Sequence, residues 1–155
     1  MHPLPDDVLD ELGRAVLCWL ATTDASGQPS VSPKEIFAPG PAGDILIADI
    51  ASAGSVRAIR AQPKVCVSFI DIFRQRGFKC IGTAEVLGPE AEGFDALAAP
   101  LIARAGPGFP VRHVIRVAVA RHAPILAPSY RLFPERSEAE RVRAAQASYG
   151  VRPAD

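Results

Sequence analysis

The stretch that decides the fold is a hairpin-like segment near the N-terminus. Residues 15–38 read AVLCWLATTDASGQPSVSPKEIFA. The apolar first part, up to Thr23, predicts a buried strand, and the Asp-Ala-Ser-Gly that follows supplies the small residues of a tight reversal. We therefore expect residues 28–38 to return as an antiparallel strand. Pro29 and Pro33 remove two donors from its ladder, which predicts an edge strand, a bulge or a strand open to a ligand.

Outward from this hairpin, the apolar periodicity predicts further strands and a few helices. Turn residues separate these elements. The predicted helices cover residues 6–14, 52–62, 90–105 and 137–149, and the further strands cover residues 45–50, 64–73, 78–87 and 113–121. Six strands with few helices fit a closed sheet, because closure removes the unpaired edges that invite aggregation. We predict a mainly β fold, a six-stranded antiparallel β-barrel with flanking helices.

Length and composition indicate one folded domain. The chain has 155 residues, 48% of them hydrophobic and 22% charged, which suits one core. We expect a single domain over residues 1–155, with residues 135–155 as a helical or flexible tail. The 17 basic residues balance 17 acidic ones, so nucleic acid is not an expected partner. Without a long apolar run or a signal-peptide start, we expect a cytoplasmic protein with no membrane partner.

The cysteine pattern does not indicate a metal centre. The three cysteines are Cys18, Cys66 and Cys80. Their odd number and wide spacing fit neither a disulfide framework nor a zinc site, so we expect buried thiols. His113 and His122 have no cysteine or carboxylate at ligand spacing, and we expect structural or surface roles for them. Trp19, within the first strand, is expected in the core.

Several motifs resemble, in order and spacing, those of the pyridoxamine 5′-phosphate oxidase-like flavoproteins. Residues 20–29 resemble the opening hairpin of that family, and residues 31–34 match the segment that meets the flavin there. Residues 47–52, followed by 55–65, are similar to a family strand, helix and next strand start. Residues 78–87 look like a later family strand with a central glycine. Each motif is weak alone, but their order makes the resemblance fairly specific.

This resemblance implies a split barrel that dimerises, with two flavin mononucleotide (FMN) sites in grooves between the subunits. A small-molecule substrate or electron donor is then the further partner. The implied cofactor-binding residues are Ser32, Pro33, Lys34, Asp49, Ile50, Ser52, Ser55, Val56, Arg57 and Lys79. Tyr130 and Arg131, on a late loop, are candidates to orient a substrate or to cover the groove of the partner.

The chemistry of FMN makes these candidates plausible. FMN carries a doubly charged phosphate, a polar ribityl chain and a flat apolar ring, so its site needs cations, hydroxyls, backbone donors and an apolar wall. Lys34 and Arg57 are candidate partners of the phosphate or pyrimidine edge, and Lys79 of a reduced anionic ring. The helix start at residues 52–55 can direct amide groups at phosphate. The alternatives are solvated surface cations and simple helix-capping serines.

Two departures from the family pattern limit the implied function. Where the pyridoxal-forming enzymes have a Ser-Arg-Lys phosphate grip, this chain has Ala53-Gly54-Ser55, unless Arg57 or Arg60 substitutes from one helical turn further on. Those oxidases also end with an Arg-His pair and a late Trp that hold the substrate phosphate. Residues 130–134 here read YRLFP, and the chain has no second Trp. Oxidation of pyridoxamine phosphate is therefore not expected.

Three functions remain open at the level of the sequence. The first is a flavin-dependent oxidoreductase of unknown substrate, in which the cofactor carries the electron transfer and no catalytic residue is identified. The second is a non-catalytic flavin-binding or redox-sensing module. The third is an enzyme of the same fold that uses a deazaflavin or haem.

Overall fold

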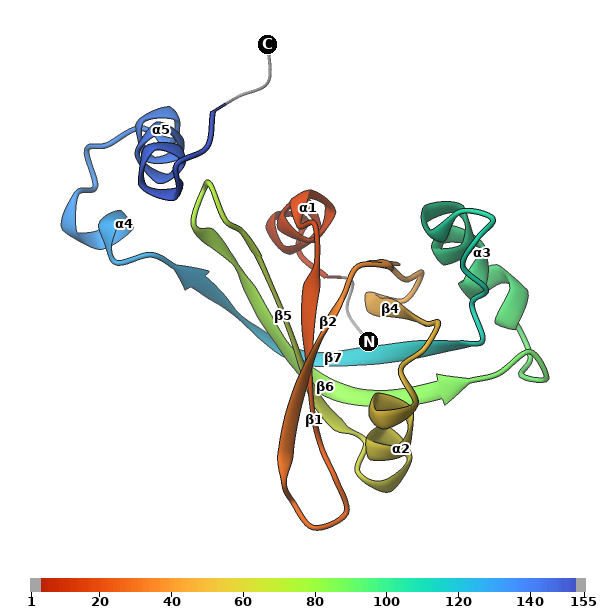
Figure 1. Ribbon diagram of the computed structural model, residues 1–155. Helices are drawn as coiled ribbons and strands as arrows, with labels where there is room; N and C mark the ends of the chain where they lie inside the picture. Colours follow the sequence, from red (N-terminus) through yellow and green to blue (C-terminus); the bar gives the residue numbers. More distant parts are fainter. Residues whose placement is uncertain (1–3, 153–155) are drawn as a thin grey trace.

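Seven strands form one curled antiparallel sheet in the computed structural model, which describes residues 4–152 (Figure 1). The order of the strands is β2-β1-β5-β6-β7-β4-β3. The strands are β1 (Cys18–Thr23), β2 (Pro29–Lys34), β3 (Phe37–Pro39), β4 (Asp44–Asp49), β5 (Lys64–Asp71), β6 (Arg76–Leu87) and β7 (His113–Leu126). The helices are α1 (Asp6–Arg14), α2 (Ala53–Ala61), α3 (Phe94–Ala105), α4 (Ser129–Leu132) and α5 (Glu138–Tyr149). The mainly β prediction is confirmed, and the assignment of residues 1–155 to one domain stays a prediction.

The predicted count of six strands is wrong, because the strand expected over residues 28–38 is two strands. β2 ends at Lys34, and β3 begins at Phe37 at the opposite edge of the sheet. The ladder with β1 runs past Pro33 to Lys34, which pairs with Cys18, whereas the carbonyl of Ile36 accepts a hydrogen bond from Ala48 N at 2.9 Å and so joins the β4 side. The prediction of an edge strand is confirmed for β2, which pairs only with β1.

The short link between β2 and β3 forces the sheet to curl. The edges of a flat seven-stranded sheet lie about 29 Å apart at the usual strand spacing. Lys34 and Phe37 are three residues apart and cannot be separated by more than about 11 Å. The two edge strands therefore meet at residues 34–37, a segment that we call the seam.

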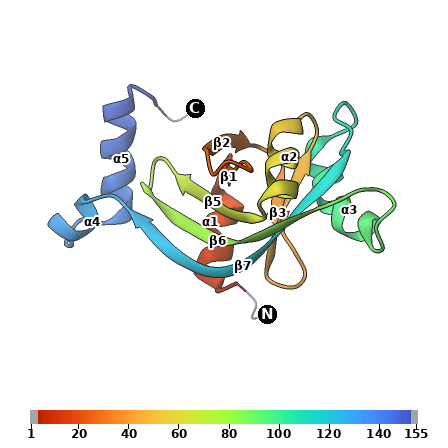
Figure 2. The ribbon, with the colours of Figure 1, turned by 90° about the horizontal axis from the view of Figure 1, so that it is seen from below.

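Strands β6 and β7 curve along their length (Figure 2), and a β-bulge at Ile81 and Gly82 helps the sheet to bend. Along β6 the partner on β7 changes from Arg121 to Val119 at this point, so that one residue of β7 is left over. A Cβ atom on Gly82 would lie 1.9 Å from the carbonyl oxygen of Ala118, so only glycine allows the two strands to approach this closely. The bulge adds local twist where the two longest strands cross the barrel.

Two apolar clusters fill the molecule. The larger one lies inside the curl and combines α1 with inward side chains of the strands, among them Leu12, Leu20, Ile47, Phe69 and Ile115. The smaller one lies between α3 and the outer side of β4 and includes Leu46, Phe94 and Leu101. Successive β4 residues thus serve different clusters, because alternate side chains of a strand point to opposite faces. β4 is buried on both faces along its whole length.

Other predictions for buried side chains have mixed outcomes. Cys18 and Cys80 are buried and Cys66 is half-buried, and all three are free thiols. Trp19 is 40% exposed, so its expected place in the core is wrong. It follows the buried Cys18 on β1 and therefore points to the outer face of the sheet.

None of the helices within residues 4–152 has the length and apolar character to cross a membrane.

The C-terminal helices form an arm beyond the far end of β7 (Figures 1 and 2). α5 begins at a capping box between Ser137 and Glu140, as the sequence predicts. The Tyr130 hydroxyl of α4 donates a hydrogen bond to the Arg74 carbonyl at 2.8 Å, and Gln75 Nε2 donates one to the Tyr149 hydroxyl at 3.0 Å. The arm is therefore held at the turn between β5 and β6.

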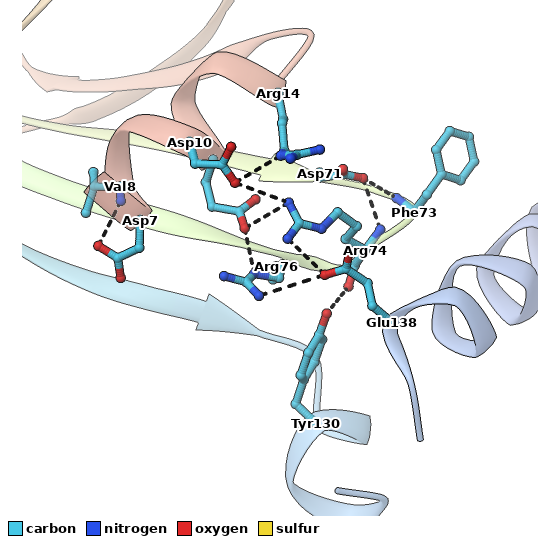
Figure 3. Close-up of polar contacts among 11 residues, drawn as sticks. Asp7, Val8, Asp10, Arg14, Asp71, Phe73, Arg74, Arg76, Tyr130 and Glu138 are labelled. Carbon is cyan, nitrogen blue, oxygen red and sulfur yellow. Dashed lines mark hydrogen bonds and ion pairs between the residues drawn. The ribbon is translucent and has the colours of Figure 1, made fainter. Parts of the chain in front are cut away.

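An ionic cluster ties α1, this turn and the arm together (Figure 3). Glu11 of α1 is fully buried, and its Oε1 atom lies 2.6 Å from Arg76 Nε and 3.1 Å from an Arg74 nitrogen. Arg74 also lies 2.9 Å from a Glu138 oxygen of α5. Burial raises the pKa of the Glu11 carboxyl, whereas Arg74 and Arg76 oppose this rise. The two arginines thus offset much of the cost of a buried carboxylate.

We expect Arg76→Ala to lower the free energy of unfolding by about 2 kcal/mol, measured by urea denaturation. Removing one partner of a buried ion pair costs about 3 to 5 kcal/mol, and here Arg74 still contacts Glu11. The control is Arg14→Ala, which removes an exposed pair with Asp10 and should cost less than about 1 kcal/mol. Equal effects of the two substitutions would contradict a structural role for the buried cluster.

Candidate functional site

The candidate site begins where β2 faces the start of α2. Ser32 and Lys34 lie two residues apart on β2 and share its inner side, while Ser52 and Ser55 lie three residues apart at the start of the helix. The Ser32 and Ser55 hydroxyl oxygens are 3.2 Å apart, and Lys34 Nζ donates to Ser52 Oγ at 2.6 Å. The predicted hydroxyls and one predicted cation therefore do meet. Their meeting depends on the seam, which brings β2 back to the β4 side.

Lys34 is a buried cation with little electrostatic compensation. Only 7% of the residue is exposed, and its ammonium group forms no ion pair with a carboxylate among residues 4–152. Burial lowers the pKa of Lys34, and the charge of Asp49 only partly opposes this. The structure thus excludes the alternative of a solvated surface lysine. A buried lysine without a counterion is a natural partner for an anionic or electron-rich ligand.

Asp49 organises the end of β4 behind Lys34. Its Oδ1 accepts a hydrogen bond from Ser52 N at 2.7 Å, and its Oδ2 lies 2.8 Å from His113 Nδ1. Asp49 and His113 are paired residues of β4 and β7, so the sheet register places this contact. The carboxylate holds the backbone turn that starts α2 and orients the imidazole. Asp49 therefore positions other groups of the site and is itself 4% exposed.

Two hollows adjoin residues 48–52, and Ser52 lines both. The first, which we call the seam cavity, has a volume of about 330 Å³. It is lined by Pro33, Lys34, Glu35, Ile36, Ala48, Ile50, Ser52, Ala105 and Phe109. The second, which we call the arginine hollow, has a volume of about 390 Å³. It is lined by Asp49, Ala51, Ser52, Ala53, Val56, Arg57, Arg60, Arg112 and His113.

Most of the predicted residues therefore gather around this junction. Those that line one of the two hollows are Pro33, Lys34, Asp49, Ile50, Ser52, Val56 and Arg57. Ser32 and Ser55 lie beside them through their mutual contact. Val56 is 6% exposed, so it serves mainly as apolar support at the foot of α2. An apolar wall, hydroxyls and cations are thus present at one place, which is the set that a flavin nucleotide requires.

Three predicted residues lie elsewhere in the chain. Lys79 is on β6, across the sheet from β2, and its register partner is Ser68 on the outer face. Tyr130 and Arg131 line a separate hollow of about 360 Å³ beside α4, at the far end of β7. Within one chain these side chains do not join the junction around Ser52. Their functional assignment stays a prediction that depends on a second subunit.

Arg112, His113 and Phe109 are lining residues that the sequence reasoning missed. The Arg112 backbone N–H donates to the Asp49 carbonyl at 2.9 Å, which fixes this arginine beside α2. Residues 49 and 112 are far apart in the sequence, and only the pairing of β4 with β7 brings them together. Their proximity is therefore not visible in the sequence. The one available signal was their position at the start of the strand predicted over residues 113–121 or just before it.

Comparison with solved structures supports the fold. Similar folds are found in an FMN-binding protein from Syntrophomonas wolfei subsp. wolfei (12% identity, TM-score 0.67, covering 79% of this chain and 86% of that one). They also occur in an F420 reductase (24%, 0.60, covering 77% and 98%) and in HupZ from Group A Streptococcus (23%, 0.66, covering 77% and 91%). At these identities the likeness concerns the fold alone.

Comparison at the level of sequence identifies the family. No curated protein sequence matches the chain. The family model described as pyridoxamine 5′-phosphate oxidase matches residues 4–124, which span α1 to most of β7 and include both hollows. The family motifs noted in residues 20–87 fall inside this match. The chain therefore belongs to the pyridoxamine 5′-phosphate oxidase family.

Proposed function

We propose that the chain binds FMN at the junction of the seam cavity and the arginine hollow and acts as a flavin-dependent oxidoreductase. The observation that carries this proposal is the buried Lys34, held by Ser52 at the rim of a largely apolar cavity. Ile36, Ala48 and Ile50 offer an apolar wall for a flat ring. The FMN-binding protein of similar fold from Syntrophomonas wolfei is consistent with this cofactor.

Each group of the site has a defined task in this proposal. Lys34 supplies a positive charge near the pyrimidine edge of the ring, where it favours an electron-rich, reduced flavin. Ser32 and Ser55 offer hydroxyls to the ribityl chain, and Asp49 keeps the start of α2 in place. When bound, FMN supplies the hydride or electron transfer, and the chain supplies binding, orientation and electrostatics. The substrate is not specified by these contacts.

We expect the purified chain to bind FMN, with quenching of flavin fluorescence in a titration. Lys34→Met should weaken FMN binding by about 1 to 3 kcal/mol, because it removes a charge-assisted contact and keeps the volume of the stem. Lys64→Met, at the exposed start of β5, is the matched control and should bind as the wild type does. Absence of FMN binding by the wild-type chain would overturn the proposal.

Turnover separates an oxidoreductase from a flavin-binding module. Bound FMN that is reduced by a nicotinamide donor and reoxidised by an added acceptor, over many cycles, supports the enzyme. Flavin that binds but is not turned over supports the module. Because an F420 reductase shares the fold, the same titration is done with F420, and tighter binding of F420 than of FMN would replace the proposed cofactor.

A second prediction concerns the cost of keeping Lys34 in the site. Burial lowers the pKa of Lys34 below its ordinary value of 10.5, so its charge destabilises the folded chain at neutral pH. That cost is full below the lowered pKa and disappears as the pH rises from there to 10.5, where the unfolded chain also loses this proton. We expect flavin-free Lys34→Met to have a higher free energy of unfolding than the wild type at pH 7, with a gap that narrows at alkaline pH. A less stable variant at pH 7 would make Lys34 a structural tie to Ser52 instead.

We propose that the protein is a homodimer that pairs through the outer face of β2, β1, β5 and β6. On this face Trp19 is 40% exposed and the neighbouring Val31 is 58% exposed, so a second copy that packs here would bury two apolar side chains. Lys79 lies on the same face, where a second copy would pack against it. In such a dimer, Lys79 of one subunit can contact the flavin site of the other.

We expect Trp19→Glu to convert the dimer to a monomer in gel filtration with light scattering, because a buried carboxylate at the centre of the interface is unpaired. The matched control is Ile102→Glu on α3, where the residue is 53% exposed on another side of the molecule. A wild-type chain that is monomeric yet binds FMN tightly would contradict the shared site.

A further inference from the structure

The arginine hollow gathers three cations from two separate parts of the chain. Arg57 and Arg60 lie three residues apart on α2, and Arg112 precedes β7. All three are exposed and line one hollow of about 390 Å³. Guanidinium groups that share a concave surface raise its positive potential and bind anions with paired hydrogen bonds.

The positive charge of this hollow is not neutralised by the chain itself. None of the three guanidinium groups forms an ion pair within the described residues 4–152. The carboxylate in the lining is Asp49, and both of its oxygens are already engaged, one by Ser52 N at 2.7 Å and one by His113 Nδ1 at 2.8 Å. A hollow with three uncompensated cations is suited to a multiply charged anion.

The start of α2 adds backbone donors to the same hollow. Helix α2 begins at Ala53 with no side-chain cap on its first N–H groups and no acidic residue in its first turn. The side chain of Ser52, the natural cap, is occupied by Lys34 instead. The amide groups of the first helical turn are therefore left for another acceptor, and the helix dipole favours a negative one.

We propose that Arg60 and Arg112, together with Arg57 and the start of α2, form a phosphate monoester site that replaces the Ser-Arg-Lys grip missing at Ala53-Gly54-Ser55. This inference rests on the proposed function, because it takes the phosphate to be that of FMN. Ser52 lines both hollows, so one ligand can place its ring in the seam cavity and its phosphate among the arginines. The consequence is a preference for FMN over riboflavin, which has no phosphate.

The test compares FMN and riboflavin titrations of the wild type and of variants. We expect FMN to bind the wild type more tightly than riboflavin, and Arg112→Ala to weaken FMN binding by about 10-fold to 100-fold while riboflavin binding changes less than about 2-fold. Arg112→Lys keeps the charge but loses the paired donors, so it should fall in between. Arg143→Ala on α5 is the control with the same loss of charge. Circular dichroism checks that each variant is folded.

The outcomes separate this inference from the proposed function. Equal affinities for FMN and riboflavin in the wild type, or equal losses of both in Arg112→Ala, overturn the phosphate site and leave flavin binding intact. If neither flavin binds, the proposed function fails, and inorganic phosphate becomes the probe. An increase of the melting temperature by phosphate in the wild type but not in Arg112→Ala would then support a phosphate site for another ligand. No increase in either protein would overturn the site as well.

Discussion

The whole structure depends on one covalent constraint, the short link between the two edge strands. β2 and β3 stand at opposite ends of the strand order, yet only Glu35 and Ile36 separate them along the chain. A sheet with tethered edges has to curl, and the curl gives the larger apolar cluster its enclosed space. The same link brings Lys34 to Ser52. Fold and site therefore arise from the same geometric requirement, so residues of the seam serve both.

Local patterns in the sequence predicted most helices, strands and turns. They predicted less well which strands pair and which way a side chain faces. The hairpin of β1 and β2, the helix α2 and the capping box of α5 follow from period, turn chemistry and capping residues. The break between β2 and β3 was missed because Ile36 and Phe37 continue the apolar pattern across it. The outward direction of Trp19 was missed because an apolar residue on a barrel strand can face either side.

The candidate site was predictable to the extent that its residues are neighbours in sequence. Ser32 with Lys34, and Ser52 with Ser55, were found from motifs of the family, and the structure brings both pairs together. Arg112 was missed because only the register of β4 with β7 places it beside Asp49. Lys79 was grouped with the others by motif alone, although the strand order places β6 away from β2. Strand order is a property of the closed sheet that no local window contains.

Two buried charges of the molecule illustrate different uses of burial. Glu11 is surrounded by Arg74 and Arg76, so its charge is matched by groups that also connect α1 to the arm. Lys34 has a hydroxyl in place of a carboxylate at hydrogen-bond distance. A buried charge with counterions of its own chain is typical of a structural contact. A buried charge without a counterion indicates a place where a bound ligand supplies the opposite charge.

The length of β7 has a consequence for how the molecule can diversify. This strand has 14 residues, so it carries the chain about 40 Å from His113 at the binding end to the arm at the other. The family match stops at residue 124, just before the arm begins. Within one chain, α4 and α5 therefore lie far from both hollows. The sequence of the arm can therefore change without altering the residues that line the two hollows of the same chain.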